Sequence, residues 1–144
     1  MKNNYINTNI FKFTSSGSPG LALWKLSNTW QSKIKNVLKP FSLTHVQFVV
    51  LANIAYLNKN DIVATATLVS QKADIDKMMT SEVVQKLIHK NLVQKIENII
   101  DKRSHYLTLT KEGTKTIIST LPLVEETDIK FFKQNKSEIE KMII

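Results

Sequence analysis

Residues 65–110 read TATLVSQKADIDKMMTSEVVQKLIHKNLVQKIENIIDKRSHYLTLT, and they predict two short helices, a tight turn between them and a basic β-hairpin. Thr65 and Asp76 stand at the starts of the two helices. The side-chain oxygen of each can accept bonds from the free N–H groups of a first helical turn. We therefore expect a mainly α fold with a small β-hairpin wing, in which residues 43–110 form a winged helix-turn-helix.

The second helix, from Asp76 to about Lys90, has two different faces. One face is apolar at helical spacing and should point into a core: Met79, Val83, Val84 and Leu87. Five side chains of this helix are expected to contact DNA: Lys77, Met78, Thr80, Ser81 and Gln85. Short polar and amide groups suit hydrogen bonding to base edges in the major groove, which is wide enough to admit a helix. The alternative is an ordinary solvated helix face.

The hairpin follows a helix end at Asn91, a residue type that tolerates the left-handed conformation. Two β-prone runs, 92–96 and 106–109, flank a polar turn. Arg103, the one arginine of the chain, can enter a narrow minor groove, where the negative potential is focused. The wing residues that we expect to contact DNA are Lys95, Asp101, Lys102, Arg103 and His105. The alternative is a solvated turn with a local ion pair of small value.

The sequence resembles the MarR (multiple antibiotic resistance regulator) family of bacterial transcription factors, without gaps over about residues 65–110. Asp101-Lys102-Arg103 is similar to the family's Asp-x-Arg wing motif, at the expected distance from Lys90-Asn91-Leu92-Val93. The resemblance implies that Arg103 enters the minor groove, that Asp101 orients it, and that residues 76–90 are the recognition helix. It also implies a homodimer on a near-palindromic operator of double-stranded DNA, with the outer helices at the dimer interface.

Four positions depart from the family pattern. Asn91 stands where glycine is common, Lys95 where arginine is common, and Ser81-Glu82 where Thr-Arg is frequent. Lys95 keeps the charge for phosphate but loses the bidentate fork of arginine. Glu82 is harder to reconcile with DNA, because phosphates repel a carboxylate. It can accept a bond from a cytosine amine or face the neighbouring helix, and the sequence leaves both roles open.

The regions outside the winged helix should form long helices. The first helix is expected to begin near Pro19 and to end before Pro40, and residues 18–42 and 111–144 are expected to be dimerisation helices. Thr44 and Gln47 have capping-box spacing before an apolar central helix, and residues 62–63 can add a short strand. A helix from Lys111 is predicted to stop at Pro122, and a last helix to begin near Glu125.

Bulk properties exclude several classes of protein. The chain has 144 residues, a formal net charge of +8 and no cysteine, so it predicts one basic domain without disulfides or zinc-thiolate sites. Residues 1–17 read as a flexible arm before a single domain over 18–144. No apolar run is long enough to span a bilayer, and the N-terminus lacks a signal-peptide core, which favours a cytoplasmic protein.

Catalysis has no support in the sequence. There is no Gly-rich phosphate loop among three glycines, and the three histidines do not form a metal-binding pattern, so we expect no cofactor and no metal. The leading interpretation is a sequence-specific DNA-binding regulator. The alternative is a winged-helix module that binds protein or RNA.

An effector site is also implied by the resemblance, since family members often bind small aromatic anions in a cleft between the dimerisation and DNA-binding regions. Aromatic residues that can furnish such a cleft are Trp24, Trp30, Phe41, Phe48 and Tyr56. All five positions are equally consistent with core packing. A ligand of this kind can act only if it prefers one spacing of the two recognition helices over another.

Overall fold

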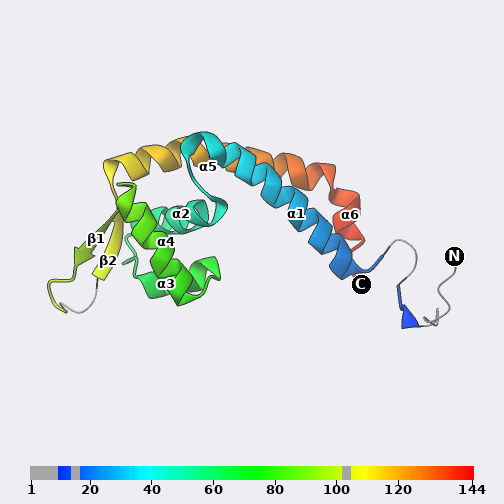
Figure 1. Cartoon of the computed structure of the whole chain (residues 1–144), viewed down its shortest axis with the longest axis horizontal. Coiled ribbons are helices and arrows are strands. Elements are labelled where there is room, and N and C mark those ends of the chain that lie inside the picture. The colour runs from blue at the N-terminus through cyan, green and yellow to red at the C-terminus, as the bar shows by residue number, and fades with distance from the viewer. Residues whose placement is uncertain (1–9, 14–16, 102–104) are drawn as a thin grey trace.

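The computed structural model describes residues 10–13, 17–101 and 105–144. Its elements in chain order are α1 (Pro19–Leu38), the short 3-10 helix η2 (Lys39–Phe41), α2 (His45–Lys59), α3 (Ala66–Ala73), α4 (Lys77–His89), β1 (Val93–Glu97), β2 (His105–Leu109), α5 (Lys111–Gln134) and α6 (Lys136–Glu140). A part made of α2, α3, α4 and the β1–β2 wing lies at one end, and α1 runs beside the later part of α5 as an extended arm (Figure 1). The prediction of a mainly helical winged helix is confirmed.

Helix α2 is the centre of the winged-helix part. The predicted capping box is present, because Thr44 Oγ1 accepts from Gln47 N at 3.2 Å and Gln47 Oε1 accepts from Thr44 N at 3.2 Å. The helix buries Val50, Leu51, Ile54 and Leu57 completely. Burying side chains of this size contributes roughly 1.5–3 kcal/mol each. Helices α3, α4 and α5 and strand β2 pack around α2, so this helix positions the whole site.

The helix-turn-helix is closed by local hydrogen bonds. Thr65 Oγ1 accepts from Leu68 N at 3.1 Å at the start of α3, as predicted. The turn after α3 passes through Asp74, whose φ of 53° is left-handed. Ser70 is buried in the last part of α3, and its hydroxyl donates across the turn to the carbonyl of Ile75. These bonds hold α3 and α4 at a defined angle without a glycine in the turn.

The wing is a two-stranded antiparallel hairpin in which Lys95 pairs with Leu107 and Glu97 with His105. The strand predicted at residues 62–63 is wrong, since this segment has no strand structure and its side chains are largely exposed. The free edge of β2 is satisfied in another way. Leu107 N donates to Ala64 O at 2.8 Å, and Asn58 Oδ1 accepts from Leu109 N at 3.0 Å while its Nδ2 donates to Leu107 O at 3.1 Å. The Asn58 side chain and the carbonyl of Ala64 therefore make the hydrogen bonds that a third strand would otherwise make to β2.

Helix α5 is longer than predicted. It runs from Lys111 to Gln134 through Pro122, so the expected helix end at Pro122 and restart near Glu125 are wrong. A proline inside a helix removes one hydrogen bond and crowds the carbonyl four residues earlier. Buried side chains lie on both sides of the proline: Ile117, Thr120, Val124 and Phe131. Their packing against α1 and α2 offsets the local cost.

The arm combines the two ends of the chain. Helix α1 begins at Pro19 with Ser18 Oγ accepting from Leu21 N at 3.1 Å, and it packs along α5 and α6. Ile34 and Leu38 are buried near the winged-helix part, whereas Leu23 and Trp24 in the first half of α1 are 60% and 67% exposed. In the described residues no single helix has the length and apolar composition to cross a membrane; α1 and η2 pass that test only together with α2, and the pair is bent by 76°.

Candidate nucleic-acid interface

Helix α4 presents an exposed face beside the wing. Asp76 caps it, with Oδ1 accepting from Met79 N at 2.8 Å, which fixes the first turn at the predicted residue. Lys77, Met78, Ser81 and Gln85 are exposed, and Met78 is 75% exposed. Asn91 follows the helix with a φ of 60°, so the predicted left-handed turn into β1 is confirmed.

The phase of the first turn of α4 differs from the prediction at two residues. Thr80 was expected to contact DNA, but it is completely buried and its hydroxyl donates to Asp76 O at 2.9 Å. Met79 was expected in the core and is 46% exposed. The physical reason is that Thr80, Val83, Val84 and Leu87 lie on one helical stripe. The Thr80 hydroxyl donates a hydrogen bond to the backbone of its own helix, so the side chain can be buried without an unpaired polar group.

A hollow of about 400 Å³ joins α3, α4 and the wing. It is lined by Thr65, Ala66, Thr67, Ser81, Val84, Gln85, Lys95, His105 and Leu107. Four of the side chains that the sequence pointed to therefore come together here, two from α4 and two from the wing. The side-chain ammonium of Lys95 makes no hydrogen bond or ion pair with any described residue, so it is available to an anion.

Sequence reasoning missed the start of α3 as part of this hollow. Thr65 and Thr67 line it, together with the first helical residue, Ala66. The N-terminus of a helix presents unpaired N–H groups and a partial positive charge, both of which favour a phosphate. The available signal was the capping role of Thr65 itself, since the residue that caps a helix also marks the end that attracts anions.

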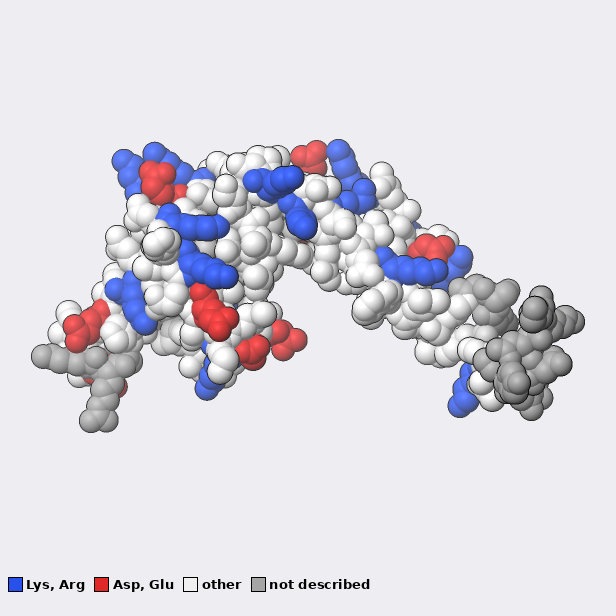
Figure 2. All heavy atoms as spheres, viewed as in Figure 1, with Lys and Arg blue, Asp and Glu red and all other residues white. Residues whose placement is uncertain are grey.

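Positive charge is spread over the molecule. On the face drawn in Figure 2, lysines lie on both the winged-helix part and the arm, with acidic groups among them. The four ion pairs of the described residues all lie on α5 and α6 or just beyond, and each is largely exposed. Net charge therefore favours a polyanionic partner without locating its binding site.

The tip of the wing is only partly described. Lys102 and Arg103 lie outside the described residues, so their expected roles stay predictions, as does the orienting role of Asp101. Ile99 and Ile100 are 94% and 97% exposed, and Asn98 Oδ1 accepts from Ile100 N at 3.0 Å. The described part of the tip thus projects away from the core.

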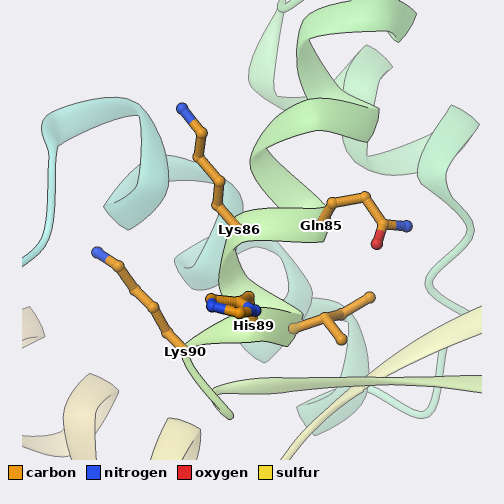
Figure 3. A pocket seen from close by; sticks show the side chains of 5 residues that line it. Gln85, Lys86, His89 and Lys90 are labelled. Atoms are coloured by element: carbon orange, nitrogen blue, oxygen red, sulfur yellow. The ribbon is translucent and has the colours of Figure 1, made fainter.

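The far end of α4 carries a second group of polar side chains. Gln85, Lys86, Ile88, His89 and Lys90 line a hollow of about 440 Å³. Figure 3 shows Lys86 and Lys90 projecting to the same side of α4 and Gln85 to the other. Lys90 Nζ donates to Gln47 Oε1 at 2.8 Å and to the carbonyl of Ser42. This lysine therefore links the end of α4 to the segment before α2.

The junction between arm and winged helix contains a polar contact. Trp30 Nε1 donates to Asp128 Oδ1 at 2.7 Å, and the Trp30 ring meets that of His45 edge-on at 5.0 Å between centroids. Burial lowers the pKa of His45, and the carboxylate of Asp128 acts in the opposite direction. Among the residues that the structure describes, no three His, Asp or Glu side chains are grouped to hold a metal.

The five aromatic residues considered for an effector cleft do not gather at one place. Phe48 is buried in the core, Trp30 is bonded to Asp128, and Trp24 and Tyr56 are 67% and 56% exposed. Tyr56 lies under Lys72, with the ammonium 5.9 Å from the ring centroid. Phe41 lines an open hollow with residues of α1 and α5. The described chain therefore does not bring these rings together as a cleft.

The fold is that of the winged helix-turn-helix proteins. Its helix-turn-helix is α3 and α4, its wing is β1 and β2, and a hollow lies between α4 and the wing. The comparisons agree. The sequence matches the family described as ArnR1-like, winged-helix domain, over residues 39–128. It is 37% identical over 115 residues to YdcH of Bacillus subtilis (strain 168), an uncharacterized HTH-type transcriptional regulator, covering 80% of this chain and 78% of that protein.

Solved structures show the same fold. A mutant of Escherichia coli MarR complexed with operator DNA matches with a TM-score of 0.70 and 21% identity, covering 80% of each chain. BpsR of Bordetella bronchiseptica, whose DNA binding is regulated by 6-hydroxynicotinic acid, matches with a TM-score of 0.73 and 20% identity over 85% of this chain and 84% of that one. The chain belongs to the ArnR1-like winged-helix family, it is related to an HTH-type transcriptional regulator, and it shares the fold of MarR.

Proposed function

We propose that the chain acts as a homodimer that binds a near-palindromic operator, with α4 in the major groove and the wing in the adjacent minor groove. The observation that carries the proposal is the hollow in which Ser81 and Gln85 of α4 face the same space as Lys95 and His105 of the wing. Amide and hydroxyl groups suit base edges, and a cation suits the phosphates between the two grooves. The E. coli MarR complex with operator DNA supports this use of the fold.

The dimer is supported by large apolar side chains that are exposed along the arm. Side chains of α1, α5 and the C-terminal end are exposed there: Leu21, Leu23, Trp24, Leu123, Ile129, Phe132 and Ile143. Scattered apolar groups are normal on a surface, but a gathering on two adjacent helices is typical of a protein interface. The C-terminus lies beside the start of α1, so both ends of the chain contribute to the same surface (Figure 1). A second copy provides the symmetric cover.

Replacing Phe132 by glutamate is expected to convert the dimer to monomers at micromolar concentration. Phe132 is 52% exposed and stacks edge-on against Phe131, so a carboxylate there would be buried without a partner in the dimer. Sedimentation velocity over a concentration series measures the change. Val63→Glu is the matched control, because Val63 is 59% exposed but lies outside the arm. A parent chain that sediments as a monomer at all concentrations refutes the dimer.

Alanine substitutions of the two wing cations distinguish sequence-specific recognition of DNA from electrostatic binding to its phosphates. Arg103→Ala is expected to weaken binding to the specific site by roughly 1–3 kcal/mol, because the guanidinium is proposed to read the minor groove. Lys95→Ala should weaken binding to all sequences similarly and reduce the salt slope by about one unit, as expected for one phosphate contact. Fluorescence anisotropy with the DNA upstream of its own gene, at several salt concentrations, measures both effects.

Lys59→Ala is the control for the loss of one positive charge, since Lys59 is the last residue of α2 and does not line the hollow. If both wing variants bind like the parent, the wing does not contact DNA. If the parent binds no DNA fragment more tightly than a random one, sequence-specific recognition is wrong and a protein or RNA partner becomes the better interpretation.

No effector site is proposed from the aromatic residues, because one subunit does not bring them together. The regulation of BpsR by 6-hydroxynicotinic acid is a property of that protein. For this chain, an effector must favour one spacing of the two recognition helices, and tight binding alone changes nothing.

A further inference from the structure

Lys90 connects the end of α4 to the first turn of α2 and to residues 42–44, the segment between the arm and the winged helix that we call the hinge. Its ammonium donates to the carbonyl of Ser42 and, at 2.8 Å, to Oε1 of Gln47. Ser42 has a left-handed φ of 54° and stands between η2 and α2, at the point where the chain leaves the arm. The contact spans 48 residues of sequence, so it joins segments that are far apart along the chain.

The amide oxygen of Gln47, in the first turn of α2, is an acceptor with a fixed position. The side chain is 6% exposed, and its amide oxygen also accepts from Thr44 N in the capping box. An acceptor already held by a helix cap cannot swing to follow the lysine. Lys90 is therefore held against the first turn of α2, and it carries the end of α4 with it.

Among the described residues, the other main packing contacts of α4 do not involve the arm. Helix α4 packs mainly on α2, α3 and β1, which all belong to the winged-helix part. The side-chain ammonium of Lys86, one turn before Lys90 and on the same side of the helix, makes no hydrogen bond or ion pair with a described residue. Of these two lysines, only Lys90 is bonded to the hinge.

We propose that Lys90 is a positioning residue that sets the angle of the recognition helix to the arm, and with it the spacing of the two recognition helices in the dimer. The inference rests on the proposed function. Spacing matters only when both helices bind one DNA molecule, because two half-sites must lie about one helical turn apart. Lys90 therefore controls binding to a complete operator and not to a half-site.

The test compares Lys90→Met with Lys86→Met, which removes the same charge from the same face of α4. For Lys90→Met we expect roughly a tenfold loss of affinity for the complete operator, the equivalent of one charged hydrogen bond. Affinity for a single half-site and the salt slope should stay at the parent values. Lys86→Met should keep the parent ratio of full-site to half-site affinity, and Lys90→Arg, which retains the donors, should restore most of the loss.

A second measurement does not require DNA. The chain has no cysteine, so Met78→Cys provides one spin-label position per subunit at the start of α4. The distance between the two labels of a dimer should become more broadly distributed with Lys90→Met and stay unchanged with Lys86→Met. A parent that dimerises but binds no DNA removes the proposed function, while the label distances still test the hinge.

Three results overturn the inference. Equal losses on half-site and complete operator assign Lys90 to general stability of the winged helix. A salt slope reduced by about one unit assigns it to a phosphate contact. Unchanged binding together with unchanged label distances shows that the bond to the hinge has no positioning effect.

Discussion

Replacing Gly113 by alanine is expected to destabilise the protein by about 3 kcal/mol, the upper part of the range for overpacking in a core. A Cβ built at Gly113 would lie 2.0 Å from the backbone oxygen of Leu92. Neither atom can move easily, because Leu92 O accepts from Thr110 N at 3.1 Å and Gly113 N donates to Thr110 Oγ1 at 2.9 Å. The start of α5 therefore has to withdraw from the turn between α4 and β1.

Urea unfolding measures this effect, and a fall of about 6–12 °C in Tm should accompany it for a chain of this size. Gly20→Ala is the matched control. Gly20 lies inside α1, and the nearest atom to a Cβ there is Ser18 Oγ at 3.9 Å. That substitution should be neutral or slightly stabilising, because alanine is the better helix former. If Gly113→Ala leaves the free energy of unfolding unchanged, the close packing of α5 on Leu92 is wrong.

Replacing Pro122 by alanine is expected to stabilise the protein by about 1–3 kcal/mol. Proline has no N–H, so residue 122 cannot donate the usual helical hydrogen bond to the carbonyl of Ile118, four residues earlier in α5. Alanine supplies the missing donor and removes the ring. Pro122 is itself exposed, so no buried contact is lost in the subunit. Urea unfolding at a fixed protein concentration measures the gain, because the proposed dimer would make stability depend on concentration.

Pro19→Ala is the control for Pro122→Ala. Pro19 stands at the first position of α1, where a helix has no use for the N–H, so its replacement should change stability little. A destabilised Pro122→Ala variant would mean that the course of α5 at the proline is required for packing along α1. In that case the internal proline is a structural requirement, not a tolerated cost.

Local chemistry explains which features were predictable from sequence. Thr44, Thr65 and Asp76 each cap a helix as expected, because a cap is recognised from a few neighbouring residues. Asn91 adopts the expected left-handed turn for the same reason. Hydrophobic periodicity placed Val83, Val84 and Leu87 in the core correctly. It failed at Met79 and Thr80, where a threonine that bonds to its own helix is buried in place of a methionine.

The sequence by itself determined the capped starts of α2, α3 and α4, the hairpin and the polar face of α4. Only the tertiary structure decided that α5 continues through Pro122, that Asn58 binds the edge of β2, and that Lys90 is bonded to Ser42 and Gln47. The physical reason is distance along the chain. Caps and turns depend on residues a few positions apart, whereas these three features depend on groups brought together by folding, whose energies outweigh local preference.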